Sequence, residues 1–312
     1  MRDASGQFDL LVGFDKLGGL DVLYCSDRST QARAARNPAL HLLPRYWEYI
    51  GLEKECFAPE RTTKVLLLSE PQLNEYWSSW TTEPKRLVLL PPTLVPARRR
   101  PELRNDGTRE EWRLRLGLSP DDWAWIAVGV QPRTKGIDRT IRALRGFADA
   151  RLLIVGLDEG GIRSAPIRRL AGWLGVADRI KWLGHREDVP ELMAAADVFV
   201  HPARYDTTGT VILEAIVNGL PVITSSACGY AKHVSTADAG IVVPEPYRQR
   251  TLVAALQAAR DAACMAHWSK SGSEYGEQSS LYEGRGRATE LIVASAQEGG
   301  KAATEARRRR SA

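Results

Sequence analysis

Cysteine and histidine are scarce in this sequence, and their spacing excludes several classes of protein. The four cysteines of the 312 residues stand far apart and form no Cys-x-x-Cys pair, so neither a zinc ribbon nor a disulfide scaffold is indicated. The five histidines show neither His-x-His nor His-x-x-x-His spacing, so the sequence predicts no bound metal. Unpaired cysteines are typical of the reducing cytosol, which is the expected compartment.

Long apolar runs are also missing. No stretch reaches the roughly 18 uninterrupted apolar residues of a membrane-spanning helix, and residues 1–7 lack the apolar segment of a signal peptide. Any contact with a membrane is therefore expected at its surface. Basic residues exceed acidic residues by 43 to 38, partly through Arg98–Arg100 and Arg307–Arg310. This mild excess suits an anionic partner, and nucleic acid, acidic lipid and phosphorylated small molecules all satisfy it.

Short apolar runs alternate with amphipathic segments of helical length from Trp123 onward. The runs predict buried strands at 123–129, 151–156, 179–184, 198–203, 221–226 and 239–243. The segments between them predict helices at 135–147, 165–175, 189–197 and 210–219, where apolar residues recur at spacings of three and four. Strands that alternate with helices are typical of a parallel sheet covered on both faces, the doubly wound α/β architecture.

A second, smaller domain is predicted before this block. Four more buried strands are expected at 8–14, 21–26, 64–69 and 86–92. The predicted order is a partial N-terminal domain (1–92), a linker (93–103), a C-terminal doubly wound domain (104–268) that ends in an amphipathic helix over 247–268, a segment whose helix crosses back to the first domain (269–297), and a disordered basic tail (298–312). The tail prediction rests on its lack of an apolar period.

Ligands of open parallel sheets bind beyond the carboxyl ends of the strands, so the loops at those ends are the candidate binding segments. After the first strand of the C-terminal domain, Arg133 and Lys135 precede a helix, and two cations beside a helix N-terminus suit a diphosphate. A solvated basic loop is the plainer interpretation of the same residues.

The loop after the fourth strand carries two carboxylates eight residues apart, Asp206 and Glu214, on either side of Thr208-Gly209-Thr210. Gly209 allows a backbone to approach a ligand closely, and the helix that starts there offers free N–H groups. Glu214 is expected in about the first turn, where its carboxylate suits sugar hydroxyls. The alternative is an acidic cap that stabilises the helix only.

Two further features suggest binding. Arg186 follows the third strand, where its guanidinium is suited to stacking on a planar base, while the neighbouring His185 is interpreted as an ordinary loop residue. The stretch 32–57 is basic and amphipathic, with interfacial aromatics, which suits an anionic membrane surface as well as an ordinary surface helix. The membrane-contact residues predicted there are Arg33, Arg36, Arg45, Trp47 and Lys54.

Taken together, these motifs resemble glycosyltransferase family 4 of the GT-B fold. The resemblance runs from about Phe8 to about Val293. It is carried by VGFDKLGGLDVLYCSD (12–27), RYWEYIGLEKECF (45–57), TEPKRLVLLPP (82–92), VGVQPRTKGIDRTIRAL (128–144), REDVPELMAAADVFVHPA (186–203), TGTVILEAIVNGLPVIT (208–224) and ACGYAKHV (227–234). It implies two Rossmann-like doubly wound domains. Because the family's opening strand, its Gly-Gly loop and two further βα units do not precede Phe8, the first domain is expected to be incomplete and the chain truncated.

The resemblance implies a role for each candidate residue. Lys135 matches the lysine that binds the donor diphosphate, and Arg133 stands one place from an arginine that the family has where this chain has Thr134. Arg186 matches a nucleobase contact. Glu214 matches the second glutamate of the Glu-x7-Glu motif, which holds the ribose, and Asp206 replaces the first glutamate with a side chain that is one methylene shorter. Thr208, Gly209 and Thr210 complete the implied donor site, and Asp206 and Lys135 are the expected catalytic pair.

The implied reaction is a metal-independent, retaining transfer of a hexose from a UDP-sugar to an inner-core heptose of lipopolysaccharide, with glucose as the expected hexose. The UDP-sugar is a co-substrate, and no cofactor and no nucleic acid are expected. The expected place of action is the cytoplasmic face of the inner membrane, whose anionic surface the stretch 32–57 would contact. The alternatives are a family 4 transferase that uses another donor, and an inactive membrane-associated fragment or scaffold.

Overall fold

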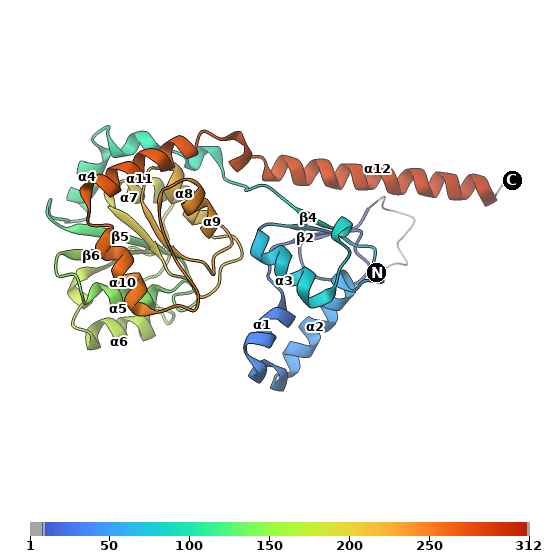
Figure 1. The fold of residues 1–312 in the computed structure, drawn as a ribbon, viewed down its shortest axis with the longest axis horizontal. Coiled ribbons are helices and arrows are strands. Elements are labelled where there is room, and N and C mark those ends of the chain that lie inside the picture. The colour runs from blue at the N-terminus through green and yellow to red at the C-terminus, as the bar shows by residue number, and fades with distance from the viewer. Residues whose placement is uncertain (1–7, 9, 311–312) are drawn as a thin grey trace. The chain divides into compact units, whose positions relative to one another are not determined.

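The computed structural model describes residue 8 and residues 10–310, apart from the side chains of Arg36 and of residues 299–310. The chain forms two compact units (Figure 1). Unit 1 comprises Met1–Thr93 and Ser280–Ala312, and unit 2 comprises Leu94–Ser279. The chain therefore leaves unit 1, builds the whole of unit 2 and returns, as the predicted crossing helix requires.

The sheet of unit 2 contains the six predicted strands. They are β5 (Trp123–Val128), β6 (Ala150–Val155), β7 (Ile180–Trp182), β8 (Val198–His201), β9 (Val222–Ser225) and β10 (Gly240–Val243). The spatial order is β10-β9-β8-β5-β6-β7, and all neighbours are parallel. The strand order reverses direction between β5 and β8, which makes the carboxyl ends of these two strands the expected ligand position in a doubly wound sheet.

Helices cover this sheet in the segments that the periodicity predicts and also at 108–115 and 231–236, where no helix was predicted. They are α4 (Thr108–Arg115), α5 (Ile137–Leu144), α6 (Ala165–Trp173), α7 (Val189–Ala195), α8 (Thr210–Val217), α9 (Ala231–Thr236), α10 (Gln249–Ala258) and α11 (Ala262–Tyr275). A core cluster joins α5, α6 and α10 to the strands through side chains such as Ile141, Ile167 and Leu252. Burial of such side chains contributes roughly 1.5–3 kcal/mol each and fixes the ends of the strands.

Unit 2 differs from the prediction at both of its ends. The helix expected over 247–268 is two helices, because the side chain of Asp261 accepts a hydrogen bond from the backbone N–H of Cys264 (2.7 Å) and caps the start of α11. The predicted domain end at residue 268 therefore falls inside α11. The predicted linker 93–103 also belongs almost entirely to unit 2, where the backbone N–H of Arg100 donates to Asn218 Oδ1 (2.5 Å).

Unit 1 contains a four-stranded parallel sheet in the order β1-β2-β3-β4, formed by β1 (Val12–Gly13), β2 (Val22–Cys25), β3 (Lys64–Leu67) and β4 (Leu87–Leu89). The first strand is much shorter than the run 8–14 that predicted it. Its helices are α1 (Thr30–Arg36), α2 (Pro44–Phe57), α3 (Glu70–Trp80) and α12 (Gly284–Arg310), with a short 3-10 segment at Pro38–Leu42.

Helix α12 corrects the prediction of a disordered tail. Its first turns pack on the sheet of unit 1, where Ala288 is buried against Val22 and Leu66. The helix then continues through residues 298–310, which were expected to be disordered for lack of an apolar period. Alanine, glutamate, lysine and arginine have high helix propensity, so this composition supports a helix without an apolar face. Residues 311–312 of the predicted tail lie outside the described residues.

Candidate functional site

The loops that follow β5 and β8 meet at the switch point of the sheet, and they bring Lys135 and Asp206 together. Lys135 Nζ lies 2.7 Å from Asp206 Oδ2. The two residues are 71 positions apart in the chain. The catalytic pair predicted from the motifs is therefore a contact pair in the structure.

Backbone contacts between the two loops fix this geometry. The N–H of Arg204 donates to the carbonyl of Thr134 (2.8 Å). Gly136 has a φ of +74°, and a Cβ there would lie 2.0 Å from the carbonyl oxygen of Pro202, so only glycine allows the loops to approach so closely. Arg204 also forms an ion pair with Asp138 (2.7 Å) in the first turn of α5. The position of Lys135 relative to Asp206 is thus set by the scaffold.

Asp206 has a second side-chain partner on its buried side. His201, the last residue of β8, places its Nε2 2.9 Å from the same Oδ2 of Asp206. His201 is only 1% exposed and Asp206 only 7% exposed. The carboxylate is therefore held between a buried imidazole on one side and a partly exposed ammonium on the other.

Their surroundings shift the pKa values of both Asp206 and His201. Burial opposes ionisation of Asp206, but the hydrogen bond from His201 and the charge of Lys135 outweigh it, so the pKa of Asp206 is lowered. Burial also favours neutral His201, yet its hydrogen bonds with Asp206 and Cys228 raise its pKa to about 9. Both pKa shifts therefore favour the ionised pair, a carboxylate on Asp206 and an imidazolium on His201.

Cys228 completes the buried part of the cluster. Its burial would raise the pKa of the thiol, but the hydrogen bond with His201 lowers it. Its segment runs beside Asp206, since the N–H of Gly229 donates to the carbonyl of Asp206 (3.0 Å). Thr224 Oγ1 donates to the carbonyl of His201 (2.9 Å) and lies 3.4 Å from Cys228 Sγ. The loop after β9 therefore supports the Asp206 loop from the side opposite Lys135.

The start of α8 offers polar groups next to the carboxylate. Gly209 precedes the helix with a φ of +76°, and no side chain caps the helix there. A Cβ on Gly209 would lie 2.9 Å from Ile212 Cδ1 and 3.4 Å from Asp206 Oδ2. Thr208 and Thr210 stand on either side, with hydroxyls 3.4 Å apart. This helix N-terminus is suited to an anion or to sugar oxygens, as the sequence predicted.

Glu214 lies one turn into α8, slightly deeper than the first-turn position expected. Its burial raises its pKa, and the charge of Arg98 partly offsets that rise. The guanidinium of Arg98 in turn donates to the carbonyl of Glu187 (3.1 Å), beside Arg186. Arg98 therefore links the helix that carries Glu214 to the loop that carries Arg186.

The two predicted arginines differ in their surroundings. Arg186 forms a bidentate ion pair with Asp188 (2.8 and 2.5 Å), and its guanidinium lies 5.8 Å from the centre of the Trp112 ring. Arg133 is exposed, and its side chain makes no hydrogen bond or ion pair with any described residue. Among the described residues neither arginine contacts the pair of Lys135 and Asp206. Their roles in donor binding stay predictions.

The predicted membrane-contact residues lie on the hairpin of α1 and α2 in unit 1 (Figure 1). Trp47 is 57% exposed, and Leu42 and Leu43 beside it are 84% and 52% exposed. Arg33, Arg45 and Lys54 are exposed on the same hairpin, and the side chain of Arg36 lies outside the described part of the structure. We call Leu42, Leu43, Trp47, Arg45 and Lys54 the hairpin patch.

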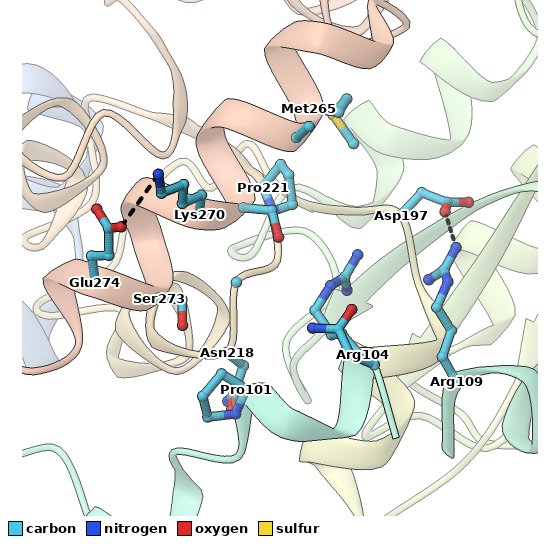
Figure 2. Close-up of a pocket in the computed structure, with 14 residues that line it drawn as sticks. Pro101, Arg104, Arg109, Asp197, Asn218, Pro221, Met265, Lys270, Ser273 and Glu274 are labelled. Atoms are coloured by element: carbon cyan, nitrogen blue, oxygen red, sulfur yellow. Dashed lines mark hydrogen bonds and ion pairs between the residues drawn. The ribbon is translucent and has the colours of Figure 1, made fainter. Parts of the chain in front are cut away.

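A separate cavity lies at the opposite edge of the sheet of unit 2, before the strands begin. It encloses about 680 Å³ and is lined by Asp197, which precedes β8, and by Pro221, which precedes β9 (Figure 2). Its basic side chains are engaged within the protein: Arg104 donates to the carbonyls of Met193 and Ala196, Arg109 pairs with Asp197, and Lys270 lies 3.8 Å from Glu274. This cavity is therefore separate from the site of Lys135 and Asp206.

The sequence analysis missed His201, Cys228 and Arg98. A histidine at the end of a buried strand, five residues before a candidate carboxylate, is a signal that could have identified His201. Cys228 and Arg98 lie far along the chain from their partners, and no spacing rule connects them. Among the described residues no group of three metal-ligating side chains is found, and none of their helices is long and apolar enough to cross a membrane.

Two parallel α/β units are the architecture of the GT-B class of glycosyltransferases, and the structural match to a member of that class places this chain in it. The family model for glycosyl transferases group 1 matches residues 108–270, which lie within unit 2. The chain belongs to this family. The resemblance drawn from the motifs is thereby confirmed.

The lipopolysaccharide glucosyltransferase WaaG of Escherichia coli K12 is 33% identical over 293 residues, which are 91% of this chain and 77% of WaaG. A crystal structure of WaaG superimposes with a TM-score of 0.85 at 32% identity and covers 92% of this chain and 79% of that one. The chain is thus a homologue of WaaG and a glycosyltransferase.

More distant relatives share parts of the chain or the fold alone. A D-inositol 3-phosphate glycosyltransferase of Mycobacteroides abscessus is 32% identical over 143 residues, which are 44% of this chain and 32% of that protein. A structure of Anabaena Alr3699/HepE in complex with UDP and glucose has a TM-score of 0.66 at 18% identity, covering 91% of this chain and 71% of that one. At this identity the likeness concerns the fold.

Proposed function

We propose that the protein transfers glucose from UDP-glucose to a heptose of the lipopolysaccharide inner core, with retention at the anomeric carbon and without a metal ion. The observation that carries the proposal is the contact of Lys135 with Asp206 beside the uncapped start of α8. Similarity to a lipopolysaccharide glucosyltransferase over 91% of the chain supports the choice of donor and acceptor.

In this proposal the donor diphosphate lies over Lys135, with Arg133 as a second cation. The side chain of Lys135 is 25% exposed, so its ammonium can turn from Asp206 toward a ligand. Arg133 is exposed, and its side chain makes no hydrogen bond or ion pair with the described residues. Two cations and the N–H groups at the start of α8 supply the charge that a metal ion supplies in other transferases.

The nucleoside would lie toward Glu214 and Arg186. A partly buried carboxylate with few partners is suited to accept hydrogen bonds from the two ribose hydroxyls. The ion pair with Asp188 fixes the planar guanidinium of Arg186, which is suited to stack on uracil. Thr208 and Thr210 would donate to oxygens between the ribose and the sugar.

The transfer itself needs one bond to form and one to break. The bond between the anomeric carbon and the diphosphate oxygen breaks, and its electron pair leaves with UDP. The heptose hydroxyl attacks the same face of the sugar, and its proton passes to the departing phosphate oxygen. Lys135 and Arg133 stabilise the charge that develops on that phosphate, which is the largest contribution expected from such a site. Asp206 orients Lys135 and the sugar hydroxyls.

The donor is tested by competition. Transfer of labelled glucose from UDP-glucose to lipopolysaccharide that ends at the inner-core heptose would be measured with unlabelled UDP-galactose, UDP-N-acetylglucosamine or ADP-glucose in excess. We expect unlabelled UDP-glucose to compete best. Stronger competition by another nucleotide sugar would assign a different donor to the same site.

We also propose that the hairpin patch contacts the anionic inner membrane surface. Its exposed Leu42, Leu43 and Trp47 would enter the interface, and Arg45 and Lys54 would contribute roughly 1 kcal/mol each near anionic lipid. Flotation with vesicles tests this. Wild-type protein should float with anionic vesicles at low salt and less at high salt, a Trp47→Ser/Leu42→Ser variant should float less, and equal flotation with neutral vesicles would contradict the proposal.

A further inference from the structure

The proposed function leaves His201 without a role, although this buried residue contacts the carboxylate of the candidate catalytic pair. It is buried to 1% exposure at the end of β8, and its Nε2 shares one carboxylate oxygen with the ammonium of Lys135. Buried histidines in a core usually bond to a carbonyl and stay neutral. This one bonds to a carboxylate that is itself nearly buried.

Asp206 cannot depend on Lys135 alone for its charge. In the proposed reaction Lys135 turns toward the donor diphosphate, and its attraction to Asp206 is then shared with two phosphates. A carboxylate that is only 7% exposed would be left with too little compensation and would gain a proton or move. A cation that stays in place on the other side removes this penalty.

We propose that His201 is a positioning residue for sugar transfer: its imidazolium holds Asp206 ionised and in place while Lys135 moves onto the donor diphosphate. The inference rests on the proposed function of Lys135 and Asp206. The raised pKa of His201, about 9, agrees with it, because the ring is then charged at the pH at which the reaction would run.

Contacts around the His201 ring hold it in position beside Asp206. Thr224 Oγ1 binds the backbone of His201, and the ring lies nearly parallel to that of Phe199, 5.4 Å between centres. The titratable groups near the ring are Asp206, Lys135 and Cys228. Cys228 hydrogen-bonds with the same ring and contributes to its raised pKa, so it supports the charged form of His201 together with Asp206.

The test compares His201→Gln with Thr224→Val. Glutamine can still donate a hydrogen bond to Asp206 but carries no charge, whereas Thr224→Val removes a buried hydroxyl from the neighbouring strand without touching Asp206. We expect His201→Gln to bind UDP within about threefold of wild type and to lose roughly tenfold or more in kcat, since misplacement of a reacting group by about 1 Å can cost a hundredfold.

The pH profile separates positioning from folding. Without the imidazolium the pKa of Asp206 should rise, so the acid limb of kcat/KM should move to higher pH in His201→Gln and not in Thr224→Val. The double variant His201→Gln/Asp206→Asn should be no slower than Asp206→Asn alone. Equal losses in His201→Gln and Thr224→Val with unmoved acid limbs would overturn the proposal.

A measurement on wild-type protein keeps the proposal testable if His201→Gln does not fold or if the chain uses another substrate. The ring nitrogen shifts of His201 in wild-type protein should show an imidazolium through neutral pH, and Asp206→Asn should convert it to the neutral ring near pH 7.5. A neutral His201 in the wild type would overturn the proposal. A protonated His201 in a chain that transfers no glucose would instead contradict the proposed function alone.

Discussion

Removal of the ammonium of Lys135 should weaken donor binding by a moderate and predictable amount. A hydrogen bond to a charged group contributes roughly 1.5–3 kcal/mol. In the free protein Lys135 is already bound to Asp206 at 2.7 Å, so binding of a diphosphate exchanges one ionic partner for another. We therefore expect the lower end of the range for Lys135→Ala, about 1.5 kcal/mol, which raises the Kd for UDP roughly tenfold.

Calorimetry with UDP measures this directly. Arg142→Ala is the matched control, because it removes one exposed positive charge from α5, just beyond the Lys135 loop. Uridine, which lacks the diphosphate, should bind wild type and Lys135→Ala equally. A change of less than twofold for UDP, or an equal change in Arg142→Ala, would refute the assignment of Lys135 to the diphosphate.

Three further predictions concern the same unit. Gly209→Ala should lower stability by about 1 kcal/mol, because the residue has a φ of +76° and its Cβ would lie 2.9 Å from Ile212 Cδ1; chemical denaturation measures the loss, and an unchanged midpoint would contradict it. Glu214→Ala should weaken uridine and UDP by the same factor, since its proposed contact is the ribose; a loss confined to UDP would place it elsewhere. The contribution of His201 to the free energy of unfolding should be fully present below the ordinary His pKa of about 6.5 and be lost as the pH rises through about 9, because the folded state raises the pKa of this ring. His201→Gln should show a flatter dependence over this window in thermal unfolding, and equal curves would contradict the linkage.

The strands of unit 2 were predictable because the central ones are buried on both faces and all are short apolar runs bounded by glycine or polar residues. Their parallel order followed from the alternation with helices, and the position of Lys135 and Asp206 followed from the rule that ligands bind beyond the carboxyl ends. The helix break at Asp261 was not predicted, because apolar residues keep a helical spacing on both sides of it. The capping bond to Cys264 decides that break, and it is visible only once the chain is folded.

The candidate site was predictable only in part, for a similar reason. Motif spacing identified Lys135, Asp206 and Glu214, which lie in loops and helix starts that a motif covers. It could not show that His201 points back at Asp206 or that Arg98 lies beside Glu214, because these contacts depend on the stacking of separate strands and segments. The helical state of residues 298–310 was missed because periodicity detects an apolar face, whereas this helix continues on propensity.

The most direct test of the central claim is transfer of labelled glucose from UDP-glucose into purified lipopolysaccharide that ends at the inner-core heptose, measured with the whole chain in excess chelator. We predict an α-linked glucose on heptose, formed at the same rate with and without the chelator and lost in Lys135→Ala. A β-linked product, a rate abolished by the chelator, or full activity in Lys135→Ala would contradict the claim that these loops bind the diphosphate without a metal and transfer the sugar with retention.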